Sequence, residues 1–275
     1  MSQYTGIIMN NADYHANHAI GKSTLDLIAR DPHLVEWSRT VKQDRSNTPA
    51  IDLGDALHAI LLEPDRLASE FAIAPKMDMR TSDGKAAMKD FREDNTGKTI
   101  LSADDYKQLV AMFDSVMAHP QARELIEADG VNERSFFWSD EGTGFDCKCR
   151  PDKFIPGRSL LVDVKSTPNI AKFSYAVEDY RYHVQAPWYC DGLKQFGSDV
   201  TMAFLVVQKN ADIGRYPVQV FKLPDDLILY GRQTYRRNLN RYAEFIKRGG
   251  MEQIQELDIH YRFIDHCIEA LEVQT

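Results

Sequence analysis

The sequence lacks the long apolar run that a membrane span requires. No stretch of its 275 residues approaches the roughly 20 consecutive apolar residues of a spanning helix. The start, MSQYTGIIMNN, also lacks the basic and apolar regions of a signal peptide. We therefore expect a soluble protein of the cytoplasm.

Cysteine is scarce as well. The chain has four cysteines, too few for the disulfide framework of a secreted protein: Cys147, Cys149, Cys190 and Cys267. Cys147-Lys148-Cys149 lacks the C-x-x-C spacing of zinc and redox motifs. An iron–sulfur site would need all four thiolates. Reduced structural thiols are the simpler interpretation.

An excess of basic residues, the usual sign of a nucleic-acid partner, is also missing. The formal net charge is -8. Positive charge nevertheless gathers in residues 76–98 and in the predicted helix 225–247, where helical spacing puts Arg232 with Arg236, and Arg237 with Arg241, on shared stripes. Such segments can line a focused positive channel or form solvated faces. Both interpretations stay open.

The length favours one elaborated α/β domain, because 275 residues are many for an average domain and few for two large ones. We expect residues 1–130 to be mainly helical, 131–222 to carry the strands and 223–275 to form a C-terminal helical region. The segment 76–98 is predicted to be an exposed arm or mobile loop. Helical patterns cover 53–62, 102–118, 173–193 and 225–247, and strand patterns cover 135–138, 145–150, 159–164, 202–207 and 216–221.

Residues 150–167, RPDKFIPGRSLLVDVKST, read as two short strands joined by a turn at Pro156-Gly157. Asp152 is predicted to close the first strand. In the second, the period of two puts Asp163 and Lys165 on one face. Two carboxylates and an ammonium group therefore converge, a compact arrangement for binding a divalent cation and hydrolysing a phosphodiester. The alternative is a solvated hairpin with a surface ion pair.

Four further residues are candidates for the same site. His58 lies beside the apolar stripe of helix 53–62, and it is a ligand only if the fold brings it to Asp152 and Asp163; otherwise it is a core or surface histidine. Gln185 and Tyr189 lie one turn apart on helix 173–193. The fourth is Glu133, just before the first predicted strand.

The order of these elements and motifs resembles the PDDEXK nuclease superfamily. An upstream helix precedes three antiparallel strands, a helix and a strand, with Asp at the end of one central strand and Asp-x-Lys on the next. The set His58, Pro151-Asp152, Asp163-Val164-Lys165 and Gln185-x-x-x-Tyr189 looks like the RecB-type branch. Within it, LGDALHAILLEPD, CKCRPDKFIP, VDVKST and DYRYHVQAPWY closely resemble the nuclease domain of the RecE (exonuclease VIII) group of prophage recombination exonucleases, over about residues 21–242. Asp163 stands where the superfamily usually has Glu, a departure that the RecE-like group shares.

The resemblance implies a restriction-endonuclease-like core, in which helices flank a central mixed sheet. It makes His58, Asp152, Asp163 and the carbonyl of Val164 the ligands of Mg²⁺ in a two-metal site, where Mn²⁺ could substitute. Lys165 would then orient or deprotonate the attacking water with a pKa depressed by positive neighbours, or stabilise the pentacovalent phosphate. Supporting roles go to Gln185 and Tyr189, which would hold Lys165 and the scissile phosphate, and to Glu133, which would touch a metal-bound water.

The resemblance further implies an exonuclease that digests the 5′-ended strand of double-stranded DNA and passes the 3′ tail to a single-strand annealing partner of the RecT type. A toroidal tetramer would let an acidic protein hold DNA in a channel lined by basic helices, including the one that bears Arg232, Arg236, Arg237 and Arg241. Two alternatives remain. One is a RecB-like nuclease of other polarity, such as a CRISPR adaptation nuclease with an iron–sulfur cluster. The other is an idle DNA-binding module on the same fold.

Overall fold

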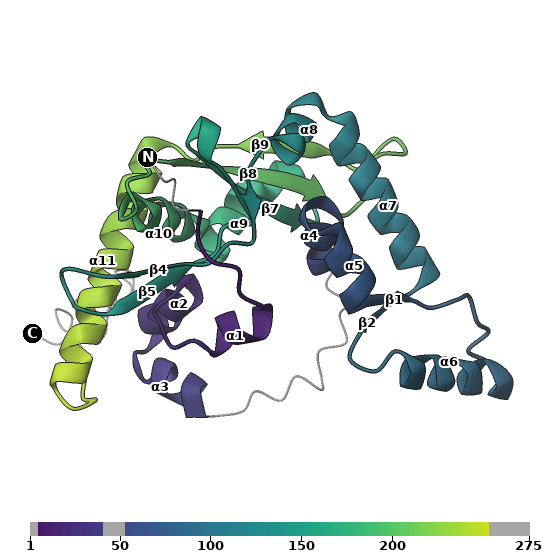
Figure 1. Cartoon of the computed structure of the whole chain (residues 1–275), viewed down its shortest axis with the longest axis horizontal. Helices are drawn as coiled ribbons and strands as arrows, with labels where there is room; N and C mark the ends of the chain where they lie inside the picture. The colour runs from purple at the N-terminus through teal and green to yellow at the C-terminus, as the bar shows by residue number, and fades with distance from the viewer. Residues whose placement is uncertain (1–4, 41–52, 253–275) are drawn as a thin grey trace, which may run out of the picture.

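A five-stranded mixed sheet forms the centre of the computed structural model, which describes residues 5–40 and 53–252 (Figure 1). The strand order is β3-β6-β7-β8-β9. Only β7 and β8 pair in parallel; the other neighbours are antiparallel. The bounds are β3 Val131–Asn132, β6 Lys153–Ile155, β7 Leu160–Thr167, β8 Thr201–Gln208 and β9 Val218–Phe221. The predicted central mixed sheet is thus confirmed.

The sheet separates two hydrophobic cores, as the alternation along β8 shows. Phe204 and Val206 belong to one core, whereas Leu205 and Val207 belong to the other. The first core is closed by α2 (Lys22–Arg30), α9 (Phe173–Asp179), α10 (Tyr182–Lys194) and α11 (Asp225–Lys247). The second is closed by α4 (Leu53–Leu62), α7 (Ala103–Ala118) and α8 (Pro120–Glu127). Helices therefore flank both faces of the sheet, as predicted.

The strands β4 (Phe136–Ser139) and β5 (Asp146–Cys149) form a separate antiparallel sheet. The sequence predicted them as part of one strand-rich centre with β7. The chain leaves β5 at Arg150-Pro151-Asp152 and enters the central sheet only at Lys153. Pro151 has no N–H to donate to a ladder, so a break there is favoured. The hairpin is tied to α10, because Nε1 of Trp188 donates to the carbonyl of Lys148 at 3.1 Å.

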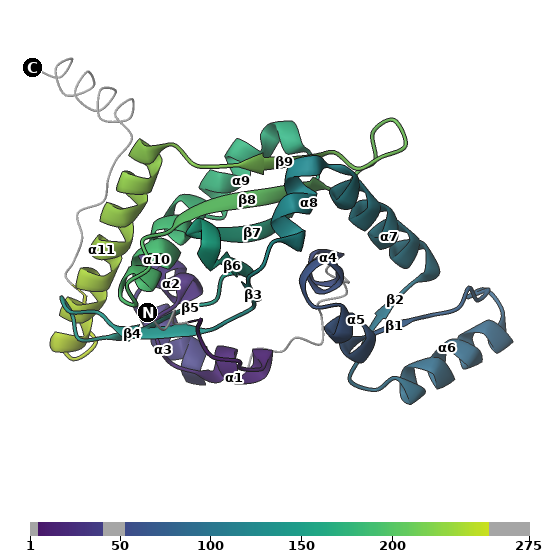
Figure 2. The ribbon, with the colours of Figure 1, turned by 45° about the horizontal axis from the view of Figure 1, so that its top comes forward.

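The segment 76–98 contains an exposed helix, α6 (Ser82–Asp94), in which no residue is buried. The predicted exposed arm is confirmed, and its central part is a helix and not a loop. The hydroxyl of Thr81 caps this helix by accepting from the N–H of Gly84 at 3.0 Å. The arm is carried by β1 (Phe71–Ile73), paired in parallel with β2 (Thr99–Leu101). Figures 1 and 2 show α6 at the end of the molecule opposite α11.

The predicted helix 173–193 is two helices, because the backbone of Arg181 is left-handed with φ 54°. A non-glycine residue in this region is strained and persists only when its surroundings hold it. Here the Arg181 guanidinium donates to Oδ1 of Asp26 in α2 at 3.0 Å. The other short elements are α1 Asn11–Ala16, α3 His33–Thr40, α5 Pro64–Glu70 and the 3₁₀ turns Pro156–Arg158 and Ile170–Lys172.

The helix α11 keeps the bounds that the sequence predicted. It buries Tyr235, Leu239 and Tyr242 and leaves a polar face outside. At Gly231 it approaches α10 so closely that an added Cβ would lie 1.7 Å from the carbonyl oxygen of His183. Neither α11 nor any other helix in the described ranges is both long and apolar enough to cross a membrane.

Candidate active site

The candidate site lies where β6 begins beside β7. The ladder between these strands reaches the Lys153–Val162 pair, beyond which the β7 edge is open. There the backbone N–H of Val164 donates to Oδ2 of Asp152 at 2.6 Å. Because the N–H and C=O of a strand residue point to the same neighbour, the Val164 carbonyl faces this edge too. Asp152 thus precedes β6, whereas the sequence analysis had it closing the preceding strand.

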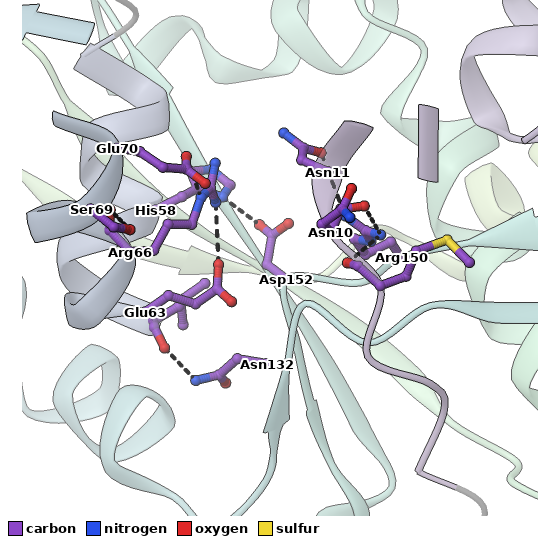
Figure 3. Close-up of polar contacts among 12 residues, drawn as sticks. Asn10, Asn11, His58, Glu63, Arg66, Ser69, Glu70, Asn132, Arg150 and Asp152 are labelled. Carbon is purple, nitrogen blue, oxygen red and sulfur yellow. Dashed lines mark hydrogen bonds and ion pairs between the residues drawn. The ribbon is translucent and has the colours of Figure 1, made fainter. Parts of the chain in front are cut away.

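His58 reaches the same carboxylate from α4 (Figure 3). Its Nδ1 lies 3.3 Å from Oδ2 of Asp152. Glu133 follows β3, and its N–H donates to the Asp152 carbonyl at 3.0 Å. One ligand atom from each of His58, Glu133 and Asp152 lies within 4.8 Å of the others. The fold therefore does bring His58 to Asp152, the condition on which its interpretation depended.

Glu133 is held in an unfavourable environment. Its backbone is left-handed, with φ 50°. Burial, and then the charges of Asp152 and Glu63, raise the pKa of its carboxyl to about 8, although Arg150 and Arg66 oppose this. Figure 3 shows His58, Glu63 and Arg66 on one side of Asp152 and Arg150 on the other. A pair of partly buried carboxylates, one of which has a raised pKa, is typical of functional sites.

Asp163 is 1% exposed and engages both of its oxygens. Nε2 of Gln185 in α10 donates to Oδ1 at 2.5 Å, and the ammonium group of Lys165 pairs with Oδ2. Apart from this ion pair, Oδ2 has no aligned hydrogen-bond donor among the described residues. Burial and the charge of Asp152 raise the pKa of Asp163 to about 6, while Lys165 and His58 lower it. The predicted common face of Asp163 and Lys165 is confirmed by their contact.

Lys165 lies between Asp163 and the ring of Tyr182, with Nζ 4.8 Å from the ring centroid. Burial alone would lower its pKa, but the charges of Asp163 and Asp152 raise it above the ordinary value. The sequence argument expected positive neighbours to depress this pKa. In the metal-free protein the nearest charged groups of Lys165 are carboxylates, so the expectation for Lys165 beside a bound cation stays a prediction.

The helix α10 carries the two remaining candidates. Gln185 holds Asp163, whereas the resemblance assigned it to Lys165 and the phosphate. Tyr189 lies one turn further along, and burial, followed by the charges of Tyr14 and Asp163, raises its pKa well above the ordinary value. No hydrogen bond of its hydroxyl is found among the described residues, so its role stays a prediction.

The arginines of α11 have partners within the chain. Arg232 donates to both carboxylate oxygens of Asp191, at 2.6 and 2.7 Å, and Arg236 pairs with Asp140 at 2.8 Å. The others are Arg241, paired with Glu252 at 2.7 Å, and Arg237, which donates to Thr234 at 3.4 Å. Figures 1 and 2 show α11 far from α4, which bears His58. Contact with DNA by these arginines stays a prediction.

The described cysteines are protonated thiols in a shielded environment. Burial raises the pKa of Cys147 and of Cys190 to about 12 and that of Cys149 well above its ordinary value. Cys267 lies outside the described residues. The iron–sulfur alternative, which needs all four cysteines, therefore stays untested.

Residues 32–253 match the PDDEXK-like domain of unknown function, DUF3799. The chain belongs to this family. The matched range includes His58, Glu133, Asp152, Asp163, Lys165, Gln185 and Tyr189. The superfamily part of the predicted resemblance is therefore confirmed.

The DUF3799 fold is also found in a solved structure. A candidate exonuclease from Eubacterium rectale aligns with a TM-score of 0.58 and 13% identity, over 94% of this chain and 98% of that one. A phage-related exonuclease from Haemophilus somnus 129PT has a TM-score of 0.33 and 14% identity, over 70% of this chain and 93% of that one. An alkaline exonuclease from Laribacter hongkongensis has a TM-score of 0.30 and 15% identity, over 71% of this chain and 97% of that one. The last two scores are too low to carry an argument, and a search of curated proteins found no match.

Sequence reasoning missed how close Glu133 lies to His58 and Asp152. The pairing of β3 with β6, in which Asn132 lies opposite Lys153, puts Glu133 beside Asp152. The two-residue strand β3 is too short for an alternating pattern to reveal it. The available signal was an acidic residue immediately before the first predicted strand.

Proposed function

We propose that this DUF3799 protein is a metal-dependent nuclease that hydrolyses phosphodiester bonds in DNA. The observation that carries the proposal is the meeting of His58, Glu133 and Asp152 at the open edge of β7, the strand that also bears Asp163 and Lys165. A non-catalytic module has no reason to keep such like charges together under partial burial. Family membership and the PDDEXK-like fold support a nuclease.

A divalent cation fits the donor set of this edge. His58, Glu133 and Asp152 each offer one ligand atom within 4.8 Å of the others, and the Val164 carbonyl faces the same way. Hard oxygen ligands suit Mg²⁺, which keeps several waters, while the imidazole would also accept Mn²⁺. The bound cation would supply Lewis-acid polarisation of the phosphate. Asp163 is not part of this group of three among the described residues, and its oxygens contact Gln185 and Lys165.

Lys165 is better suited to stabilising charge than to accepting a proton. Its raised pKa keeps it an ammonium group with three donors, which can orient an attacking water and neutralise charge on the pentacovalent phosphate. The ring of Tyr182 supports this ammonium by a cation–π contact. Gln185 fixes the orientation of Asp163, and through it the position of Lys165.

We further propose the more specific activity that the RecE-like stretches suggest. The protein would be a cytoplasmic, Mg²⁺-dependent exonuclease that degrades the 5′-ended strand of duplex DNA and leaves 3′ tails for recombination by single-strand annealing. A RecT-type annealing protein would be its partner, and a toroidal tetramer its assembly. The support is the sequence resemblance, together with the exonuclease description of the Eubacterium rectale protein.

Digestion of duplex DNA labelled on one end of one strand tests the proposal. With Mg²⁺ or Mn²⁺ we expect a 5′ label to be released as mononucleotides before a 3′ label on an otherwise identical duplex. EDTA or Asp152→Asn should abolish this, while Glu141→Gln, a change at an exposed turn, should not. Loss of the 3′-ended strand instead would identify the nuclease of other polarity. Binding without hydrolysis under every metal condition would identify the idle module and refute the proposed activity.

A further inference from the structure

Three stacked aromatic rings lead from the core beside the site to the surface. Phe204 is the β8 partner of Asp163 and is fully buried. The ring of Tyr182 stacks on that of Phe204, with centroids 5.6 Å apart and planes 28° apart. The ring of Tyr180 stacks on Tyr182 in turn, at 5.7 Å and 25°. Tyr180 is 61% exposed, so the stack ends in solvent.

This stack adjoins the cation that we assign to the reacting phosphate. The ammonium group of Lys165 lies 4.8 Å from the centroid of Tyr182, the middle ring. A phosphate at Lys165 would therefore bring its neighbouring nucleotide close to the outer ring, Tyr180. Asp163 and Lys165 are recessed, with side chains 1% and 18% exposed. A recessed site favours a strand that has separated from its complement over an intact duplex.

The turn that carries Tyr180 is fixed from the neighbouring helix α2. Nζ of Lys22 donates to the Tyr180 carbonyl at 2.5 Å and pairs with Asp26 at 2.6 Å. The left-handed Arg181 is held by the same carboxylate at 3.0 Å. Strain of this kind is maintained only by surroundings that over-determine the backbone. The outer ring is thus presented in one orientation, which lowers the entropic cost of binding a planar ligand.

We propose that the exposed face of Tyr180 stacks on an unpaired DNA base next to the scissile phosphate. This rests on the proposed nuclease function and adds the state of the substrate that the site takes. Every base has a planar π face, and single-stranded nucleic acids are bound by aromatic rings combined with positive charge along the backbone. Lys22 and Arg181 share the single carboxylate of Asp26, so one net positive charge remains beside the rings. A base would continue the stack as its fourth ring.

Tyr175 provides a matched control on the adjacent helix α9. It is 66% exposed, close to the exposure of Tyr180. No ring contact of Tyr175 is found among the described residues, whereas Tyr180 is part of the stack. Removing Tyr175 therefore deletes an equally exposed tyrosine without shortening the row of rings.

The test measures stacking directly in an inactive background, Asp152→Asn in EDTA, which leaves the Asp163–Lys165 pair and the rings unchanged. DNA with frayed ends carries 2-aminopurine at the terminal nucleotide of one strand or the other. We expect binding to quench the fluorescence of one of the two labels. Tyr180→Ala and Tyr180→Leu should lose the quenching and bind frayed ends roughly tenfold more weakly, within the range of about five- to hundredfold for one stacked base. Tyr180→Phe and Tyr175→Ala should behave like the parent.

Three outcomes separate this inference from its rivals. Unchanged quenching and affinity in Tyr180→Ala, in a protein that remains folded by circular dichroism, would overturn it. So would a changed assembly mass in ultracentrifugation with normal quenching, because Tyr180 would then cover a second copy of the chain. If the wild type with Mg²⁺ or Mn²⁺ cuts no DNA and the inactive form binds none, the proposed function itself fails. If the protein cuts DNA but Tyr180→Ala leaves quenching and affinity unchanged, only the stacking proposal is refuted.

Discussion

Replacing Glu133 by glutamine tests the carboxylate cluster through its effect on stability. In the folded protein without metal, burial and the charges of Asp152 and Glu63 raise the pKa of Glu133 from 4.5 to about 8. A folded-state pKa above the unfolded value means that the folded protein holds the proton more tightly. The resulting stabilisation is fully present below about pH 4.5 and is lost as the pH rises through about 8.

The expected fall in unfolding free energy follows from the size of the Glu133 pKa shift. One pKa unit corresponds to about 1.4 kcal/mol, so the upper limit is about 5 kcal/mol. Solvent access to a partly buried carboxyl and its coupling to Asp152 reduce the expected fall in unfolding free energy to about 2–3 kcal/mol. Because 1 kcal/mol shifts the midpoint of a chain this long by about 2–4 °C, Tm in EDTA should fall by roughly 4–12 °C between about pH 5.5 and 8.5.

Thermal melts of the wild type, Glu133→Gln and the exposed control Glu141→Gln check this expectation. In EDTA at about pH 8.5, Glu133→Gln should be more stable than the wild type and nearly insensitive to pH above about 6.5. Mg²⁺ or Mn²⁺ should restore the wild type at high pH, because a cation stabilises the ionised cluster, and should restore Glu133→Gln less. A wild-type Tm in EDTA that rises with pH, or a Glu133→Gln profile that follows the wild type, would refute the reasoning.

Three further changes test the rest of the site. His58→Ala should lose hydrolytic activity, and excess Mn²⁺ should partly restore it. Its Tm in EDTA should change little, because the imidazole is 23% exposed. Full activity of this variant would show that His58 is not part of the site. Asp163→Asn should abolish hydrolysis without lowering the unfolding free energy in urea in EDTA above about pH 6, because burial and the charge of Asp152 disfavour the ionised carboxyl despite its pair with Lys165; a marked loss of stability would contradict this reasoning. In the inactive Asp152→Asn background, the double variant Lys85→Gln/Lys89→Gln should reduce the slope of log K for DNA against log salt by about two units. The double variant Arg236→Gln/Arg241→Gln should reduce this slope less, because both arginines are already paired with carboxylates. A larger reduction by the arginine variant would indicate that α11, and not α6, binds DNA.

Much of the fold could be predicted because its signals are local. The alternating buried and polar positions of a strand predict the shared face of Asp163 and Lys165. Ser102 and Asp105 form a capping box that sets the start of α7, as the sequence indicated. The bounds of α11 follow from its unbroken helical period between Asp225 and Lys247.

The features of the fold and site that the sequence did not predict depend on contacts between residues far apart in the chain. The sequence around Arg181 does not predict its left-handed backbone conformation, because the residues that hold it, such as Asp26, lie on α2. Likewise, Glu133 approaches Asp152 only through the β3–β6 pairing.

The internal pairing of the α11 arginines changes where an acidic chain would meet DNA. A phosphate could reach Arg232 or Arg236 only in competition with Asp191 or Asp140, which already neutralise them. On α6, Lys85, Lys89 and Arg92 recur at i, i+4 and i+7 and so share one face of a helix that buries no residue.

The charge of α6 is also available at little cost. Lys89 pairs with Glu93 at 3.6 Å, but both side chains are more than 60% exposed, so this pair is weak and screened by salt. Asp83, Asp90 and Asp94 lie on the opposite side of the helix, which leaves the lysine face positive. The β1–β2 pair links this helix to the half of the molecule that contains α4, away from α11 (Figure 2). A net charge of -8 therefore does not by itself argue against DNA binding, and contact of the α6 lysines with DNA stays a prediction.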